Sequence, residues 1–344
     1  MLRFLQNVLS RLEREGVDCA VACPSFMHSS LPSLHTLPWE IPDRPRLTAD
    51  IRWAWQARRW QQDYDLLHAH GLRAVSVLSI LPPARWLFML HNLPPENLSL
   101  TARWLLRRAA RSTKNVLSVS RAVQSAWLKH FPDTEPKCTV VPGGVDVHMM
   151  AQSVPDAPEA RSRWNLPVHA PVALCVGRLM EDKGVDVLLN ALVHAPQWFA
   201  LIVGEGPLRH SLQKLAADLG VGERVRFTGY LESLDCAWAT CDVAVVPSRR
   251  EGLGLFALEA MAACKPVIAS STGGLVEIVR HGENGWLVPP EDPLALANML
   301  QQAFAFRDAW REIGEQGRRY VRQHYTWEHT VQRLLECYQR LVST

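Results

Sequence analysis

Hydrophobic and polar residues follow two patterns along the chain, and these predict helices and strands in regular succession. Residues 2–15 repeat apolar side chains at helical spacing, and residues 17–23 form a short apolar run typical of a buried strand. Further along the N-terminal half, the patterns predict helices at 49–62, 72–80, 99–111 and 121–130, and strands at 65–70, 86–91, 115–119 and 137–141. Strands that alternate with helices are typical of α/β folds with parallel sheets.

A second series of the same patterns follows a polar stretch from Pro142 to about Asn165, which we predict to be a linker. The series comprises strands at 171–177, 199–203, 224–228, 242–247 and 266–270, and helices at 184–194, 208–219, 254–263, 293–304, 307–323 and 327–342. A chain of 344 residues exceeds the size at which one hydrophobic core usually stops growing. We therefore predict two Rossmann-like, doubly wound α/β domains that face each other across a cleft. Their predicted bounds are 1–165 and 166–325, with a final helix at 326–344.

Composition is ordinary for a globular protein, but charge is unevenly distributed. Hydrophobic residues make up 48% and charged residues 21%, and the net charge of +3 is too small to indicate a nucleic-acid partner. Residues 1–150 carry 18 Lys and Arg against 12 Asp and Glu, whereas the remainder carries 19 against 22. A basic N-terminal half suits an anionic acceptor or a membrane surface.

The cysteines and the apolar runs bear on where the protein works. The eight cysteines are scattered without a CxxC pair, which disfavours zinc ribbons and thioredoxin-like chemistry and favours free thiols in a reducing cytosol. No apolar run approaches the roughly 20 residues that span a bilayer. Arginines interrupt the first helix and no cleavage site follows, so we expect no signal peptide and a cytoplasmic protein.

The candidate chemistry lies just after the predicted strands, where ligands bind in open α/β sheets. Arg178 and Lys183 share the loop after the first strand of the second series, and Gly184 precedes the next helix. Arginine binds phosphate oxygens with two parallel hydrogen bonds, lysine is a compact point charge, and a helix N-terminus adds free N–H groups. The alternative is a pair of solvated surface cations.

The segment SRREGLGLFALEAMA contains two glutamates, Glu251 and Glu259, which are separated by seven residues. Gly252 and Gly254 permit positive φ and expose N–H groups where a helix starts. The spacing alone arises by chance in a chain of this length, but Glu259 lies in an otherwise apolar helix, where a carboxylate needs donors. The two hydroxyls of a ribose would supply them.

Other strand ends add weaker signals. VGEGPLRH, which starts at Val203, has two close glycines, and RFTGYL, which starts at Arg226, ends a strand where backbone groups could meet a nucleobase; a tight turn explains the first equally well. In the N-terminal half, His70 and His91 end neighbouring strands and are placed to reach a cleft. For His68 we favour a structural role.

Taken in order, these segments resemble a known family. GRLMEDKG, VGEGPLR, VRFTGYL, VVPSRREGLGLFALEAMAACKPVIAS, GGLVEIVRHGENGWLVPPED and YTWEHTVQRLLECYQRL resemble the retaining, nucleotide-sugar-dependent glycosyltransferases of GT-B fold, known as group 1 or family 4. VVPGGVD resembles the segment between the domains of that family, and the last helix resembles the one that crosses back to the N-terminal domain. The resemblance covers nearly the whole chain and is most specific in the C-terminal half.

The resemblance implies a role for each matching residue. It implies a catalytic set of Arg178, Lys183, Glu251 and His91. It implies donor binding by Glu259, Gly252, Leu253, Gly254, Gly204, Glu205, Tyr230, Leu231 and His70. The cations would neutralise the leaving diphosphate, so the resemblance implies no metal and no other cofactor. Front-face attack, with the leaving phosphate accepting the acceptor's proton, would need no separate base.

The implied substrates are a UDP- or GDP-sugar and a glycan or lipid-linked acceptor, in the biosynthesis of surface polysaccharide, lipopolysaccharide or glycolipid. One alternative is a sucrose- or trehalose-type synthase that acts on soluble sugars. Another is an inactive, truncated protein that binds sugar nucleotides. The presence of all four charged residues of the implied site disfavours the inactive protein; these are Arg178, Lys183, Glu251 and Glu259.

The start of the chain departs from the family pattern. In the family a strand and a glycine-rich loop usually precede the first helix, whereas here Met1 already stands at that helix. The resemblance therefore predicts that the first N-terminal strand and glycine loop are missing, through a start codon placed too late or a truncated product. We expect such a chain to be less stable and poorly active.

Two predicted helices interleave tryptophan with arginine. They are IRWAWQARRWQQ, from Ile51, and TARWLLRRAARSTK, from Thr101. Such helices suit an anionic membrane surface or a lipid-linked acceptor, which predicts a peripheral protein on the inner face of the cytoplasmic membrane. The alternative is that the tryptophans pack on the sheet while the arginines face water.

Overall fold

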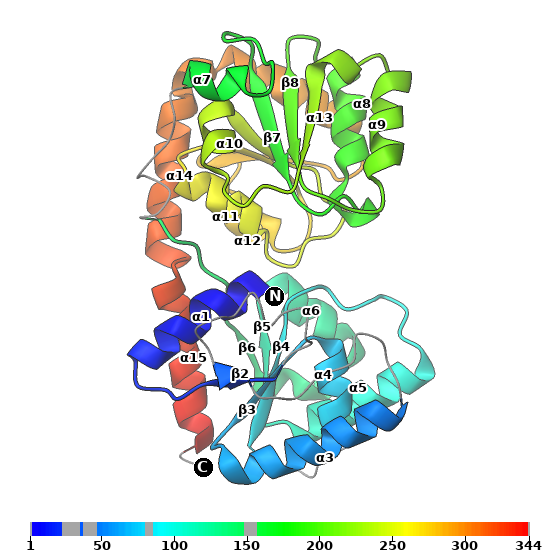
Figure 1. Ribbon diagram of the computed structural model, residues 1–344, viewed down its shortest axis with the longest axis vertical. Coiled ribbons are helices and arrows are strands. Elements are labelled where there is room, and N and C mark those ends of the chain that lie inside the picture. The colour runs from blue at the N-terminus through cyan, green and yellow to red at the C-terminus, as the bar shows by residue number, and fades with distance from the viewer. Residues whose placement is uncertain (1, 23–34, 37–46, 80–84, 148–156, 343–344) are drawn as a thin grey trace. The chain divides into compact units, whose positions relative to one another are not determined.

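The computed structural model describes residues 2–22, 35–36, 47–79, 85–147 and 157–342 (Figure 1). By its internal contacts the chain divides into two compact units, each described here by itself. The N-terminal unit comprises Met1–Gly144 together with Trp327–Thr344, and the C-terminal unit comprises Val145–Thr326. The last helix therefore belongs to the N-terminal unit, although it ends the chain.

The N-terminal unit is built on a parallel sheet with the strand order β3-β4-β5-β6. These strands are β3 (Leu67–His70), β4 (Trp86–Leu90), β5 (Asn115–Ser118) and β6 (Cys138–Val140). A separate parallel pair joins β1 (Ala20–Val21) to β2 (His35–Thr36). The strand expected at 17–23 is thus reduced to Ala20–Val21. Cys23, the last residue of the expected range, lies outside the described part of the chain.

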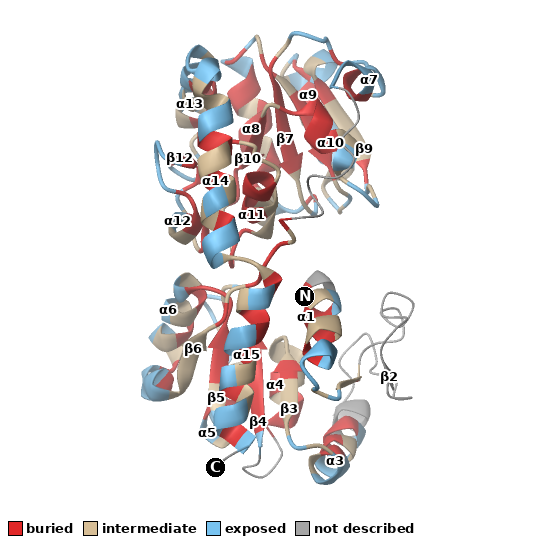
Figure 2. Cartoon of the chain, turned by 90° about the vertical axis from the view of Figure 1, so that its left-hand side faces the viewer, coloured by how far each residue is buried: buried red, intermediate tan, exposed pale blue. Residues whose placement is uncertain are grey.

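The helices of the N-terminal unit bury the sheet. They are α1 (Leu2–Arg14), α3 (Leu47–Asp63), α4 (Leu72–Leu78), α5 (Leu100–Ser112), α6 (Arg121–His130), the 3-10 helix η1 (Pro132–Lys137) and α15 (Trp327–Val342). All five residues of β4 are buried, as Figure 2 shows in red, which fits a strand covered on both faces. Helices α5 and α6 begin where Ser99 and Ser120 accept the N–H groups of Ala102 and Val123.

The C-terminal unit has a six-stranded parallel sheet with the order β12-β11-β10-β7-β8-β9. The strands are β7 (Val172–Val176), β8 (Phe199–Val203), β9 (Val225–Gly229), β10 (Val243–Val246), β11 (Val267–Ser270) and β12 (Gly285–Val288). Successive strands run outward in one direction from β7 and in the other from β10. The order therefore reverses between β7 and β10, which is where ligands bind in doubly wound sheets.

Helices cover both faces of this sheet. They are α7 (Ala157–Ser162), η3 (Glu181–Lys183), α8 (Val185–Val193), α9 (Arg209–Asp218), η4 (Gly222–Arg224), α10 (Asp235–Thr240), α11 (Leu255–Ala262), α12 (Leu275–Ile278), α13 (Pro293–Ala305), η5 (Arg307–Ala309) and α14 (Trp310–His324). Helix α8 packs between α9 and α13, and α11 packs against α14 and α12. Alternate residues such as Ala173 and Cys175 face the α8 side, which is the period of two expected of strands.

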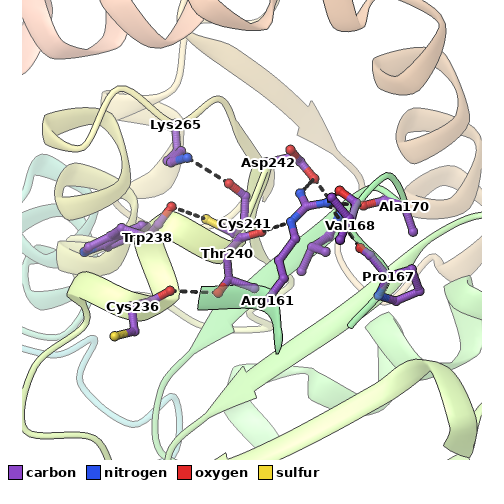
Figure 3. A network of polar contacts seen from close by, with 11 residues as sticks. Arg161, Pro167, Val168, Ala170, Cys236, Trp238, Thr240, Cys241, Asp242 and Lys265 are labelled. Atoms are coloured by element: carbon purple, nitrogen blue, oxygen red, sulfur yellow. Dashed lines mark hydrogen bonds and ion pairs between the residues drawn. The ribbon is translucent and has the colours of Figure 1, made fainter. Parts of the chain in front are cut away.

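The segment predicted as a linker contains α7, and the reason is a buried arginine (Figure 3). Arg161 donates from Nε to the Thr240 carbonyl at 3.1 Å and pairs through Nη2 with Asp242 Oδ2 at 2.8 Å. The same carboxylate oxygen accepts the N–H of Val172 at 2.8 Å. Burial raises the pKa of Asp242, and Arg161 opposes that rise. Arg161 therefore ties α7 to the starts of β7 and β10.

Within the described ranges, no helix is both long enough and apolar enough to cross a membrane.

Candidate functional site

Two loops meet where the strand order of the C-terminal unit reverses. One loop follows β7 and ends at Gly184, and the other follows β10 from Pro247. Gly184 has φ of +62°, and a Cβ there would lie 1.9 Å from the Pro247 carbonyl oxygen. Only glycine allows this approach without displacing the backbone.

An ion pair joins these loops. Lys183 Nζ lies 2.8 Å from Oε2 of Glu251, and the Ser248 hydroxyl donates to the same oxygen at 3.1 Å. The Glu251 side chain is only 15% exposed, whereas that of Lys183 is 29% exposed. A lysine that remains partly open to solvent beside a more buried carboxylate can still receive an anionic ligand.

Arg178 and Lys183 lie in the same loop, as the sequence predicted. The Lys183 stem passes close to Gly177, where an added Cβ would lie 3.8 Å from its Cγ and Cδ. Arg178 follows Gly177 directly and is exposed. Two positive charges therefore stand at the carboxyl edge of β7, one of them held by a carboxylate.

A glycine pair at the start of the GGLVEIVRHGENGWLVPPED segment supports Glu251. Gly273 has φ of +52°, and a Cβ on it would lie 1.8 Å from the Glu251 carbonyl oxygen. The N–H of Gly274 donates to that oxygen at 3.1 Å. The consecutive glycines after a predicted strand are the signal from which this close approach could have been found.

The residues after Glu251 lead into helix α11. Gly252 and Leu253 are buried, and Gly254 caps the helix with φ of +95°. Glu259 lies on the second turn of α11 and is half-buried, next to the buried Leu258 and Ala260. A carboxylate therefore stands on a largely apolar helix, as predicted.

The loops after β8 and β9 lie along the same edge. The N–H of Gly204 donates to the Gly229 carbonyl at 2.8 Å, and the Glu205 carbonyl accepts the N–H of Leu179 at 2.9 Å. The Glu205 carboxylate pairs with Arg209. Tyr230 is 70% exposed, and Leu231 next to it is half-buried. The structure thus brings the predicted C-terminal site residues to one edge of the sheet, and their roles stay predictions.

The predicted histidines form a cluster of their own in the N-terminal unit. His70 Nδ1 lies 2.8 Å from His91 Nε2, and the His68 ring stacks near His70 with centroids 4.1 Å apart. His68 Nδ1 is hydrogen-bonded to the Tyr338 hydroxyl of α15 at 2.7 Å, which fits its structural role. Phe4 contacts His91 edge-on, with centroids 5.0 Å apart. Burial lowers the pKa of each of the three histidines well below its usual range, so the cluster is neutral at neutral pH.

Both halves of the chain match known families. Residues 156–320 match the model described as glycosyl transferases group 1, and residues 1–149 match glycosyltransferase family 4.

Curated relatives agree with these matches. The GDP-mannose-dependent alpha-(1-6)-phosphatidylinositol monomannoside mannosyltransferase of Mycobacterium tuberculosis is 32% identical over 68% of this chain and 64% of its own length. The D-inositol 3-phosphate glycosyltransferase of Xylanimonas cellulosilytica is 36% identical over 58% of this chain. The match spans 50% of that relative, so both alignments cover less than two thirds of the relative's length. The D-inositol 3-phosphate glycosyltransferase of Corynebacterium urealyticum is 31% identical over 81% of this chain and 72% of its own.

Solved structures share the fold. The Anabaena protein Alr3699/HepE, in complex with UDP, gives a TM-score of 0.87 at 23% identity and covers 98% of this chain and 96% of its own. Sucrose-phosphate synthase from Thermosynechococcus elongatus gives 0.82 at 26% identity and covers 99% of this chain and 92% of its own. Together with the two parallel sheets, these likenesses confirm the two Rossmann-like α/β domains of the GT-B fold. The chain belongs to the group 1, family 4 glycosyltransferases.

Proposed function

We propose that this protein transfers a sugar from a UDP- or GDP-sugar to a glycan or lipid-linked acceptor. The observation that carries the proposal is the pairing of Lys183 with Glu251 where the strand order reverses. The Lys183 ammonium can release the Glu251 carboxylate and bind phosphate oxygens instead, so it can stabilise a departing nucleoside diphosphate. Two similar proteins add support, since the mycobacterial relative is GDP-mannose-dependent and the Anabaena protein was solved in complex with UDP.

In the proposed reaction, Arg178 and Lys183 stabilise the negative charge that develops on the departing diphosphate. Glu259, half-buried on the second turn of α11, accepts hydrogen bonds from the ribose hydroxyls. Glu251 lies beside the transferred sugar. The remaining donor contacts in this unit come from Gly252, Leu253, Gly254, Gly204, Glu205, Tyr230 and Leu231. The roles that the resemblance implies for His70 and His91 stay predictions.

We further propose that the anomeric configuration is retained. The bond from the anomeric carbon to the phosphate oxygen breaks as the acceptor oxygen attacks from the same face. The acceptor's proton passes to the leaving phosphate, so Glu251 acts as neither nucleophile nor base. No metal is needed in this scheme because the two cations take its electrostatic part.

Purified protein tests the proposal directly. Incubation with a panel of UDP- and GDP-sugars should raise the melting temperature for one donor, since a ligand that binds the native state stabilises it. The protein should consume that donor in the presence of EDTA. NMR should show that the transferred sugar has the same anomeric configuration in the product as in the donor. An inverted product would overturn retention, and no binding of any nucleotide sugar would overturn the proposed function.

The likeness to sucrose-phosphate synthase favours a second candidate, a synthase acting on small soluble sugars. The same assay separates the two, because it is run with soluble sugar phosphates in one arm and with a lipid-linked saccharide in the other. Transfer to soluble sugars alone would replace the lipid or glycan acceptor in our proposal.

Two aromatic residues on the N-terminal unit support an anionic acceptor surface. On α3 and α5, Trp53 and Trp60 are buried, but Trp55 is 67% exposed and Trp104 is 62% exposed. Exposed arginines accompany both tryptophans, at positions 52, 58, 59, 103, 107 and 111. Exposed tryptophan among arginines is the composition of a helix surface that binds anionic lipid. We propose that these two helices bring the enzyme to the membrane that carries its acceptor, in polysaccharide, lipopolysaccharide or glycolipid synthesis.

Vesicle flotation checks this surface. The protein should float with vesicles containing anionic lipid at low salt and should be released as salt screens the attraction. The double variant Trp55→Ser, Trp104→Ser should lose flotation, whereas Phe306→Ser, which removes an aromatic residue 65% exposed on the other unit, should not. Equal flotation of all three proteins would contradict the proposed surface.

A further inference from the structure

Arg249 binds carboxylates and a carbonyl from two other loops. Its Nη1 and Nη2 donate to the two carboxylate oxygens of Asp186 at 2.8 and 2.7 Å. Nη1 also donates to the Glu181 carbonyl at 2.8 Å, and Nε donates to Glu291 Oε1 at 2.8 Å. The side chain is 21% exposed. A planar guanidinium with a two-point carboxylate contact holds its partner in a fixed orientation.

The backbone of Arg249 makes further hydrogen bonds to other loops. Its N–H donates to the Asp182 carbonyl at 2.8 Å, and its carbonyl accepts the Thr272 hydroxyl at 3.1 Å. Loops that follow β7, β10, β11 and β12 therefore converge on one residue. We call Arg249, Asp186 and Glu291 the loop clamp.

In both loops, the residues of the Lys183–Glu251 ion pair are close in sequence to residues of the loop clamp. Lys183 ends the 3-10 turn Glu181–Lys183 that Arg249 contacts, and Glu251 comes two residues after Arg249. The same two loops are thus joined twice, once through Lys183 and once through Arg249. Only the first of these links uses a group that the proposed function gives to the donor diphosphate.

Arg249 itself is a poor candidate for a diphosphate ligand. A guanidinium has five N–H groups, and four of the Arg249 groups already donate to Asp186, Glu181 and Glu291. The hydrogen bonds that Arg249 donates to Asp186 lower the pKa of Asp186 and raise the pKa of Arg249. Both groups therefore remain charged over the ordinary pH range, and the link persists there.

We propose that Arg249 is a positioning residue, which holds the Lys183 turn against the Glu251 loop while Lys183 exchanges Glu251 for the donor diphosphate. Without this link, departure of Lys183 from Glu251 would leave the loops joined by fewer bonds just when the diphosphate must be held. The inference rests on the proposed function, and it adds a residue that contacts no substrate.

The test compares Arg249→Gln and Arg249→Lys with the matched control Arg311→Gln, which removes a surface ion pair with Glu315 from a side chain 91% exposed. Nucleoside diphosphate affinity by calorimetry and kcat/KM for the donor are measured on protein shown to be folded. Arg249→Gln should lower kcat/KM at least about tenfold, because small displacements of binding groups are costly to rate. Arg249→Lys should recover part of this loss, and Arg311→Gln should match wild type.

A double-mutant cycle with Lys183→Gln separates positioning from simple stability. If Arg249 acts through Lys183, Arg249→Gln should have little further effect on affinity once Lys183 is replaced. An equal loss in both backgrounds would overturn the proposal, as would wild-type kcat/KM in a folded Arg249→Gln protein.

Amide hydrogen exchange tests the loop clamp without any ligand. Exchange at residues 181–186 should be faster in Arg249→Gln than in wild type or Arg311→Gln, and unchanged exchange would overturn the clamp. Faster exchange in a protein that binds no nucleoside diphosphate would instead confirm the clamp and overturn the proposed function.

Discussion

At the scale of single residues, the two glutamates of the GLG segment have different surroundings. Glu251 accepts hydrogen bonds from Lys183 and Ser248 at the edge of the sheet. Glu259 stands on the second turn of α11, a helix whose buried residues are all apolar. Neutralising the first changes the partner of the cation proposed to bind the diphosphate, whereas neutralising the second removes a negative charge proposed to meet the ribose.

Glu259→Gln should weaken nucleoside diphosphate binding about tenfold, since a hydrogen bond to a charged group contributes roughly 1.5–3 kcal/mol. Glu251→Gln should leave that affinity unchanged or raise it, because Lys183 loses a competing partner, and should mainly lower kcat. Calorimetry with UDP and GDP and initial rates of donor consumption measure the two effects. The reverse pattern would exchange the two assignments.

The sequence could predict these glutamates but not everything that holds them. Lys183, Glu251 and Glu259 lie in short motifs after strands, where the type of residue indicates its chemistry. Gly273 and Arg249 act through contacts between loops that are distant along the chain. In the sequence one is a common turn residue and the other an ordinary surface cation, so only the fold reveals what they touch.

At the scale of elements, the predicted strands other than 17–23 and most predicted helices agree with the observed ranges to within a residue or two. They are predictable because apolar runs are buried on both faces of the parallel sheets. The predictions missed β2, α7, α12 and β12. Helix α7 has six residues and few apolar ones, and it is held by Arg161, whose partners lie about 80 residues away at Thr240 and Asp242.

Arg161→Ala should destabilise the C-terminal unit by about 3 kcal/mol, because it removes the hydrogen bonds of a buried guanidinium and leaves the half-buried Asp242 carboxylate without its cation. The measurement is urea unfolding followed by a signal from that unit. The control Arg311→Gln removes an exposed pair and should change stability by at most about 1 kcal/mol. A loss no larger than that of the control would show that the Arg161 network does not hold α7.

At the scale of the whole molecule, the repeated strand–helix alternation correctly predicted two α/β units with parallel sheets. The contacts assign the last helix to the N-terminal unit, where Tyr338 meets His68. That unit also holds three half-buried, neutral histidines, which give the molecule a dependence on pH that no single motif indicated.

Acid should destabilise the N-terminal unit. The pKa of each clustered histidine lies below its unfolded value, so below about pH 6.5 the unfolded chain binds protons that the folded chain does not. Stability should therefore be full above that pH and fall as the pH drops, by about 1.4 kcal/mol per pH unit for each histidine.

Melting curves between pH 7 and pH 5 measure the effect. The double variant His70→Asn, His91→Asn should have a shallower pH dependence than wild type. His194→Asn, an exposed site in the other unit, serves as the control and should keep the wild-type slope. A slope in the double variant equal to or steeper than that of the control would contradict the neutral cluster.

The most direct test of the central claim is calorimetric titration of UDP and GDP into the wild type and Lys183→Gln. The account predicts that the wild type binds one nucleoside diphosphate more tightly than its monophosphate. It also predicts that Lys183→Gln loses about tenfold or more of that affinity, as expected for a charge-assisted contact to phosphate. Equal affinity of the two proteins for the diphosphate would contradict a donor site built on Lys183 and Glu251.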